Sequence, residues 1–315
     1  MVRCVFAVAV AALLVTTPAL ARQQMVDPGF RPTVERPTYA EGQGPVVVID
    51  GAHHNFHRID GQYAPFAALL TADGYRVGGG DKAFDQGGLD GVDVLVIANA
   101  GAVREPEGPI FTDSEIEALE AWVRAGGRLL LIADHAPFGA AAEPLAARFG
   151  VRMGKGYAFV PTPQGVSTNL EYAGDAFGDH PIMSGREADE RVEGVTAYTG
   201  QSLAGPEGAT ILLPMAAGAR EAVDPPVLQR ITDRIAAGQE AGAVVTEMSA
   251  AALPAQALAF SHGDGRVVVL GEAGMLTAQR VRFPDGREMS FGMNAAPGNA
   301  RFGLNILHWL TGLLP

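Results

Sequence analysis

The sequence has a single cysteine, Cys4, which lies close to the amino end. Residues 1–21 are typical of a secretory signal peptide, because Arg3 gives a positive start, 4–15 is apolar and Ala19-Leu20-Ala21 fits a cleavage site. Cleavage after Ala21 would leave a mature chain without cysteine. Such a chain has no disulfide, no thiolate metal ligand and no cysteine nucleophile.

Basic residues are also scarce. Lysine occurs only as Lys82 and Lys155, and the formal net charge is -12. An acidic chain without a basic cluster argues against nucleic-acid binding and against binding to anionic membrane surfaces. The apolar run 4–15 is too short to cross a bilayer as a helix. We therefore expect no nucleic-acid partner, no membrane span, and a periplasmic or secreted protein.

The rest of the chain divides into two parts. Residues 22–44 carry Pro28, Pro32 and Pro37 and show no apolar period, which predicts an extended leader or a loose arm. Residues 45–315 contain no repeat and no clear linker, which predicts one domain.

Buried strands alternate with helices through residue 150. Strands are expected at 45–50, 75–77, 92–98 and 128–133, and helices at 63–73, 112–125 and 140–149. Thr112 and Glu115 have the spacing of a capping box. This alternation predicts an α/β fold with a mainly parallel, doubly wound sheet. Further on, strands are expected at 195–198, 209–215, 243–247, 256–260 and 266–271, and helices at 227–240 and 300–313.

Polar residues follow several of these strands. The stretch VVVIDGAHHNFH (46–57) runs from a buried strand into a carboxylate and three of the seven histidines. Because ligands gather at the carboxyl ends of parallel strands, these side chains are predicted to surround one pocket. The candidates for catalysis are Asp50, His53, His54, Asp134, His135 and Glu272, and those for binding are His57 and Asn99.

Each candidate has a structural alternative. Asp, Asn and Gly are favoured in the turns that follow strands, whatever the function. Asp134-His135 could act as an orienting carboxylate and a general base, since histidine titrates near neutral pH, or Asp134 could only cap the next helix. Glu272 could be a general acid or base, a ligand anchor or a turn carboxylate.

A divalent metal is the cofactor that the histidines suggest. Neutral imidazoles beside a carboxylate suit zinc or iron, and the candidate ligands are His53, His54, His57 and Asp134. Their spacing matches no named metal motif, so a loop with one ligand-binding histidine is the alternative.

The remaining candidate residues give weaker indications of function. No serine has the GxSxG setting of a nucleophile elbow. Asn294 precedes the last helix and is a candidate binding residue, whereas Asn299 is expected to be the N-cap of that helix. His308 lies on an apolar helix face and is expected in the core.

A resemblance covers nearly all of 45–315. The segments that carry it are IDGAHHNFH, GYRV, DVLVIANA, GGRLLLIADHAPF, HPIMSGR, GDGRVVVLGEAGM and GMNAAPGNARFGLNILHWL. Together they resemble exported bacterial proteins of unknown function with a class I glutamine amidotransferase-like domain. The resemblance implies a flavodoxin-like three-layer sandwich.

The same resemblance argues against the family's chemistry. The place of the amidotransferase cysteine falls near Asp134 or His135, so the thiol is absent. Of the family's His-x-Glu pair, Glu272 remains and the histidine does not. Hydrolysis of glutamine through a thioester is therefore not expected.

Two classes of function follow. The first is an exported hydrolase that uses the Asp/His cluster, with or without a metal, on an envelope-derived substrate. The second is a non-catalytic domain that binds a sugar, a peptide or a small anion in the same crevice.

Overall fold

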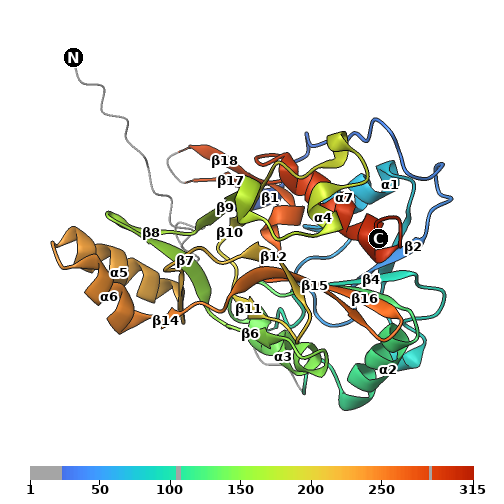
Figure 1. Ribbon diagram of the computed structural model, residues 1–315, viewed down its shortest axis with the longest axis horizontal. Coiled ribbons are helices and arrows are strands. Elements are labelled where there is room, and N and C mark those ends of the chain that lie inside the picture. Colours follow the sequence, from blue (N-terminus) through green and yellow to red (C-terminus); the bar gives the residue numbers. More distant parts are fainter. Residues whose placement is uncertain (1–22, 104–107, 284–285) are drawn as a thin grey trace.

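A computed structural model describes residues 23–103, 108–283 and 286–315. The signal peptide predicted over 1–21 lies outside the described residues. The chain forms a main body and a smaller lobe that projects from it (Figure 1).

The main body is built on a nine-stranded sheet. Five of its strands are parallel, in the order β3 (Arg76–Gly80), β2 (Val46–Asp50), β4 (Val94–Ala98), β5 (Arg128–Ile132) and β16 (Gly265–Leu270). The others pair antiparallel: β15 (Ala255–His262), β11 (Leu203–Ala204), β6 (Arg152–Met153) and β12 (Thr210–Pro214). Strands β2, β4, β5 and β16 are mostly apolar, as expected where both faces of a sheet are covered, whereas the edge strand β3 is glycine-rich and partly exposed.

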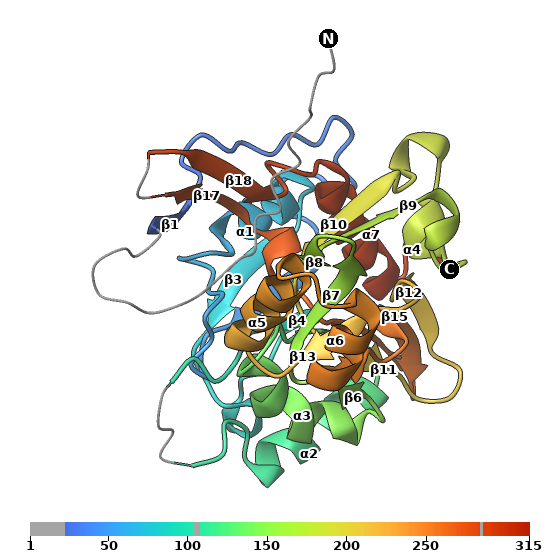
Figure 2. The ribbon, with the colours of Figure 1, turned by 90° about the vertical axis from the view of Figure 1, so that its left-hand side faces the viewer.

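Alternate residues of the strands enter two cores. Val94 and Val96 of β4 belong to one core, and Leu95 and Ile97 belong to the other. The first core is closed by α1 (Ala64–Ala72) and α7 (Gly298–Leu310), and the second by α2 (Asp113–Arg124) and α3 (Phe138–Arg148). Helices therefore cover both faces (Figures 1 and 2).

The predicted capping box at the start of α2 is confirmed. The Thr112 side chain accepts from the Glu115 backbone N–H, and the Glu115 carboxylate accepts from the Thr112 backbone N–H. The box fixes the first turn of α2, and with it the position of the Glu115 side chain.

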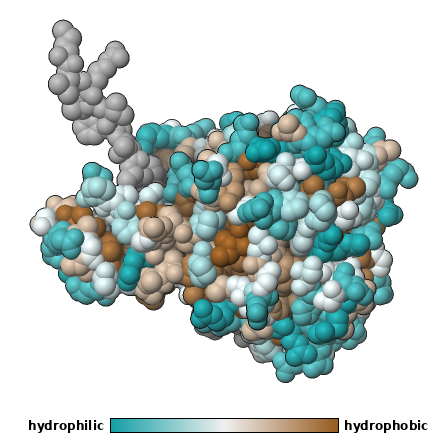
Figure 3. All heavy atoms as spheres, in the orientation of Figure 1, coloured by the Kyte–Doolittle hydropathy of each residue, from teal (hydrophilic) through white to brown (hydrophobic). Residues whose placement is uncertain are grey.

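The lobe has its own small core. It combines a four-stranded sheet with two helices: β7 (Tyr157–Thr162), β8 (Gly165–Ser167), β13 (Arg220–Ala222), β14 (Ala250–Ala251), α5 (Pro225–Ala236) and α6 (Ala241–Met248). On the face shown in Figure 3, apolar residues are more frequent over this lobe than over the end that carries α2.

One predicted strand in this lobe is wrong. Residues 243–247 belong to helix α6, whose first N–H groups are capped by the Glu240 carboxylate. Val244 and Val245 pack side by side into the lobe core, which a strand would have turned to opposite faces.

Two small sheets complete the fold. One consists of β1 (Gln23–Val26), β17 (Ala278–Arg282) and β18 (Glu288–Gly292), and the other of β9 (Asn169–Ala173) and β10 (Gly194–Tyr198). The short helices are α4 (Pro181–Ser184), η1 (Phe84–Gln86), η2 (Gly174–Ala176), η3 (Ala188–Glu190) and η4 (Gly274–Leu276).

The segment before β2 is not a loose arm. It supplies β1, which pairs with β17, and its Phe30, Val34 and Tyr39 pack against the first core. Its prolines prevent regular structure without preventing packing.

The predicted flavodoxin-like three-layer sandwich with a mainly parallel sheet is wrong. The described residues hold 18 strands in four sheets, and only five of these strands are parallel to their neighbours. The antiparallel strands come mostly from 151–262, where the sequence shows little regular pattern. That region turns one half of the main sheet antiparallel and builds the lobe.

Candidate functional site

The loop after β2 holds a buried triad of charged groups. His53 Nδ1 lies 2.8 Å from Asp50 Oδ2, and His53 Nε2 lies 2.8 Å from Glu115 Oε1. The His53 ring packs between Phe84 and Phe111, with centroids 4.4 and 4.7 Å away. All three polar side chains are buried. Because both ring nitrogens face carboxylates, both donate.

The triad holds His53 as a cation. Burial lowers the pKa of His53, but the hydrogen bonds and charges of Asp50 and Glu115 outweigh burial and raise it. Burial likewise raises the pKa of Glu115, but the bonds from His53 and Thr112 lower it. An imidazolium with both N–H groups engaged is not free to act as a base.

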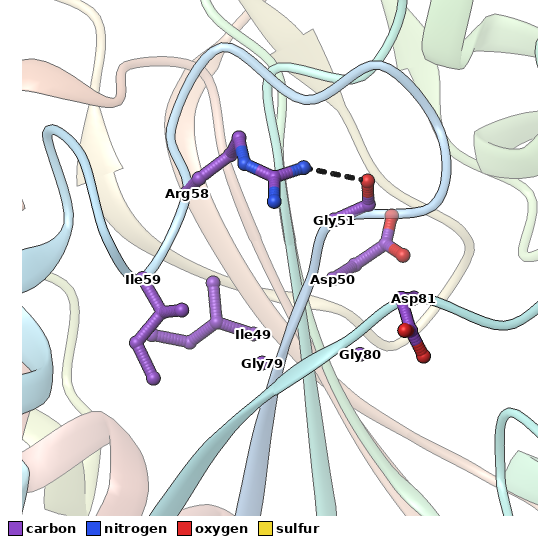
Figure 4. A pocket seen from close by; sticks show the side chains of 8 residues that line it. All are labelled: Ile49, Asp50, Gly51, Arg58, Ile59, Gly79, Gly80 and Asp81. Atoms are coloured by element: carbon purple, nitrogen blue, oxygen red, sulfur yellow. Dashed lines mark hydrogen bonds between the residues drawn. The ribbon is translucent and has the colours of Figure 1, made fainter.

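Two cavities open beside this triad. The smaller, of about 210 Å³, is lined by Ile49, Asp50, Gly51, Arg58, Ile59 and Asp81, with Gly79 and Gly80 of β3 (Figure 4). The larger, of about 330 Å³, includes His53, His54, Asp81 and Glu115 in its wall. Asp81 belongs to both, so the two cavities meet at this carboxylate. We call them the Arg58 cavity and the His54 cavity.

A second cluster lies further along the strand ends and is closed to solvent. His57 is 4% exposed, its ring centroid lies 4.8 Å from that of Tyr63, and its Nδ1 has no partner among the described residues. Burial, helped by the charge of His135, lowers the pKa of His57 to about 3. His57 is therefore neutral at physiological pH, unlike His53.

Two carboxyl groups belong to the closed cluster. Glu272 is 1% exposed, and its oxygens accept from the backbone N–H groups of Gly274 and Met275 at 2.5 and 2.7 Å. Burial and the charge of Asp134 raise the pKa of Glu272 well above its ordinary value, although the backbone N–H groups oppose this. Asp134 Oδ1 accepts from the His135 N–H at 2.7 Å.

His135 lies beside Asp134. Its ring stacks on Tyr157 with centroids 4.3 Å apart, its Nδ1 donates to the Ala136 carbonyl, and its Nε2 lies 3.9 Å from Asp134 Oδ1. Burial and the charge of Asp134 raise the pKa of Tyr157 to about 12. The interpretation of Asp134 as a helix cap is wrong, because no side chain caps α3.

Asn99 joins the two clusters. Its side-chain oxygen accepts from the Asp134 N–H at 2.8 Å, and its carbonyl accepts from the Phe56 N–H at 2.9 Å. It takes a left-handed conformation with φ 51°, which asparagine tolerates better than most residues. The loop after β2 is thereby tied to the loop after β5.

The other predicted residues lie in different settings. His54 is exposed at its cavity, with φ 52°. Asn294 contacts the small β1-β17-β18 sheet, where its Nδ2 donates to Asp27 Oδ2 and to the Gln279 carbonyl. Asn299 is not an N-cap, because its side chain bonds the backbone N–H and carbonyl of Thr196. His308 lies in the core, as predicted, 2.7 Å from Asp73.

The proposed metal ligands do not form a metal site. His53 is bound by two carboxylates, His54 is exposed, and His57 is buried in the closed cluster with Asp134. Within 23–103, 108–283 and 286–315 there is no group of three or more His, Cys, Asp or Glu side chains placed to hold a metal ion.

Sequence reasoning missed several residues of this edge. Glu115 was expected only as a helix cap, yet its second oxygen reaches His53. Gln201 is fully buried, and its Nε2 donates to the carbonyls of Ala133 and Asp134. Arg58 and Asp81 complete the open cavities. These contacts join distant segments, so no local pattern shows them.

The family model described as "Domain of unknown function (DUF4350)" matches residues 55–293. This match covers most of the chain, including Glu115 and the closed cluster, and begins just after His54. The chain belongs to the DUF4350 family. The predicted class I glutamine amidotransferase-like domain is therefore wrong, and the missing thiol agrees with this correction.

Solved structures resemble this DUF4350 chain at low sequence identity. The structure "mmIFT52 N-terminal domain" has 13% identity and a TM-score of 0.56, covering 84% of this chain and 97% of that one. A "Putative thua-like protein from Bacteroides uniformis ATCC 8492" has 12% identity and a TM-score of 0.42, covering 86% and 93%. "Cytoplasmic Protein STM1381 from Salmonella typhimurium LT2" has 13% identity and a TM-score of 0.43, covering 84% and 98%. The first likeness shows a shared fold only.

No curated protein sequence matches the chain. Among the helices of the described residues, none has the length and apolar character needed to cross a bilayer.

Proposed function

We propose that this chain is an exported binding domain that takes a small polar molecule in the two cavities beside Asp81. The observation that supports it is a contrast in the state of the polar groups. The groups suited to acid–base chemistry are occupied: His53 by two carboxylates and Glu272 by backbone N–H groups. The side chains of Asp81 and His54, in contrast, line open cavities and have no hydrogen-bond partner in the described part of the chain.

The charge of the cavity walls narrows the ligand class. Three carboxylates, Asp50, Asp81 and Glu115, face two cations, His53 and Arg58. A net negative wall disfavours a small anion and favours a molecule rich in hydrogen-bond donors. A sugar or a peptide fits this description.

A hydrolase is the second candidate, and one observation favours it. Asp134 and Glu272 are neighbouring carboxyl groups, and the pKa of Glu272 is raised by burial and by Asp134. A carboxyl group whose pKa is raised beside a second carboxyl group is an arrangement that general acid–base catalysis uses. An envelope-derived substrate would then react beside His135, which is the partly exposed member of this cluster.

One experiment separates the two candidates. Isothermal titration calorimetry with sugars and peptides is combined with a hydrolase substrate panel, with and without chelator, on wild type, Asp81→Asn and Asp134→Asn. We expect binding without turnover, weakened about tenfold or more in Asp81→Asn. Asp90→Asn is the matched control, because Asp90 is exposed on the same loop and lines neither cavity. Turnover that is lost in Asp134→Asn would support the hydrolase instead.

Export is tested separately. Amino-terminal sequencing of protein recovered from the periplasm or medium is expected to begin at Arg22. Recovery of the intact Met1 form from the cytosol alone would contradict it.

A further inference from the structure

We infer that the ligand of these cavities is a free α-amino acid, with its carboxylate on Arg58, its ammonium on Asp81 and its side chain in the His54 cavity. This inference rests on the proposed binding function and names its ligand. It follows from three features of the Arg58 cavity.

The first feature is an incompletely used guanidinium. Arg58 Nη1 donates to the Gly51 carbonyl at 2.9 Å and Nε contacts Asp60 Oδ1 at 3.3 Å, while Nη2 makes no hydrogen bond within the described residues. Figure 4 shows the guanidinium reaching across the cavity toward Gly51. The bond from Nη1 holds the group in place and leaves Nη2 to donate. A ligand carboxylate is the acceptor that a guanidinium binds best.

The second feature is an unpaired carboxylate. Asp81 follows the last glycine of β3, is exposed, and makes no hydrogen bond or ion pair within the described ranges. The carboxylates of Asp50 and Glu115, by contrast, are both bound to His53. Asp81 is therefore the acceptor on this wall that remains for a ligand ammonium. Its place in both cavities puts that ammonium where they meet.

The third feature is the size and lining of the smaller cavity. Its wall is partly glycine: a Cβ on Gly79 would lie 2.9 Å from Ile59 Cγ2, and one on Gly80 would lie 2.8 Å from Val48 Cγ1. These positions therefore resist larger side chains. Ile49 and Ile59 supply the apolar part of the lining, beside the two charged groups (Figure 4).

The two charges of opposite sign define the ligand. A guanidinium alone would select a simple carboxylate, and a carboxylate alone would select an amine. A molecule that carries both groups on one carbon satisfies both walls of a 210 Å³ cavity. The adjoining His54 cavity, with Pro109 and Ile110 in its wall, receives a side chain with an apolar part.

The test uses the full mature chain and the twenty L-amino acids, each added singly in a thermal-shift assay. The amino acid that binds best is then measured by calorimetry beside its N-acetyl and its carboxamide derivatives. We expect each derivative to bind about tenfold or more weakly, because each removes one charged contact.

Variants assign each contact. Arg58→Ala is expected to lower the affinity for the amino acid about tenfold, but not to lower the affinity for the carboxamide further. Asp81→Asn is likewise expected to lower the affinity for the amino acid, but not the affinity for the N-acetyl derivative. Arg58→Lys keeps the charge and should bind more tightly than Arg58→Ala, which guards against a folding defect. Asp90→Asn is the control: Asp90 is exposed, lines neither cavity and should leave affinity unchanged.

The outcomes separate this inference from the proposed function. If none of the twenty amino acids binds but a sugar or peptide does, and Asp81→Asn weakens it, the inference fails and the binding function stands. Derivatives that bind as tightly as the parent also overturn the inference. If no tested molecule binds, both fail.

Discussion

His53 and His57 lie in one short loop, yet the protein holds them in opposite states. His53 is bonded by two carboxylates beside open cavities, and these bonds raise its pKa. His57 packs against Tyr63, its Nδ1 has no partner among the described residues, and burial lowers its pKa to about 3. The same residue type is thus a cation on the open side of the edge and a neutral aromatic group on the closed side.

The comparison shows that burial alone does not set the charge of a group. Both rings are at most 5% exposed. What differs is the presence of carboxylates within hydrogen-bond distance. On the open side, His53 is paired with Asp50 and Glu115, and Asp81 remains for a ligand. On the closed side, His57 is neutral.

The strongest test of this comparison is to remove the cation. His53→Ala leaves Asp50 and Glu115 buried without their partner, and we expect a loss of about 3–5 kcal/mol in the free energy of unfolding. Urea unfolding measures it. His54→Ala, at the exposed neighbour, should change stability by less than about 0.5 kcal/mol. A loss below about 1 kcal/mol in His53→Ala would show that the triad is not a buried charge network.

The pH dependence of the two histidines should have opposite signs. Below pH 6.5 the unfolded chain protonates His57 and the folded chain does not until about pH 3, so stability falls as pH falls, by up to about 1.4 kcal/mol per unit. The stability that His53 contributes is present below pH 6.5 and is lost as pH rises through its raised pKa.

Histidine NMR titration measures both. The His53 ring should titrate above pH 6.5 and the His57 ring should not titrate until about pH 3. His57→Phe should flatten the acid side of the stability profile relative to wild type. Equal titration midpoints for the two rings would contradict the comparison.

The smallest expected effect concerns the N-cap of α2, which positions Glu115 beside His53. Thr112→Ala removes the N-cap of α2 and one of the hydrogen bonds that position Glu115, with an expected loss of about 1 kcal/mol. Thermal unfolding checks it. Ser114 lies two residues further along and its side chain makes only exposed hydrogen bonds, so Ser114→Ala should lower stability by less. Equal losses would mean that the cap does not stabilise this helix.

The features that could be predicted from the sequence are those encoded locally. The strand that ends at Asp50 and the cap at Thr112 depend on residues a few positions apart, and both were predicted. The bond from Glu115 to His53 joins residues far apart in the chain. The capping box by itself accounts for Glu115 in the sequence, so nothing there indicates this second contact. Helix α6 was mistaken for a strand because five residues with an apolar pair fit both periods.

The architecture beyond residue 150 could not be predicted from the sequence, for a related reason. Strands such as β6 and β11 have two residues each, and they depend on the sheet they join rather than on their own pattern. The regular alternation of strands and helices through residue 150 alone therefore favoured a parallel sheet. The antiparallel half and the lobe became visible only in the structure.

The pairing of β1 with β17 sets an order of events during synthesis. Gln23 lies opposite Arg282, so the first strand of the described chain has no partner until nearly the whole protein has been made. Closing so long a loop is entropically costly and slow, so this sheet should form last. If the chain is exported amino end first, as proposed, β1 would remain unpaired while the rest follows, and its docking would mark the completion of folding.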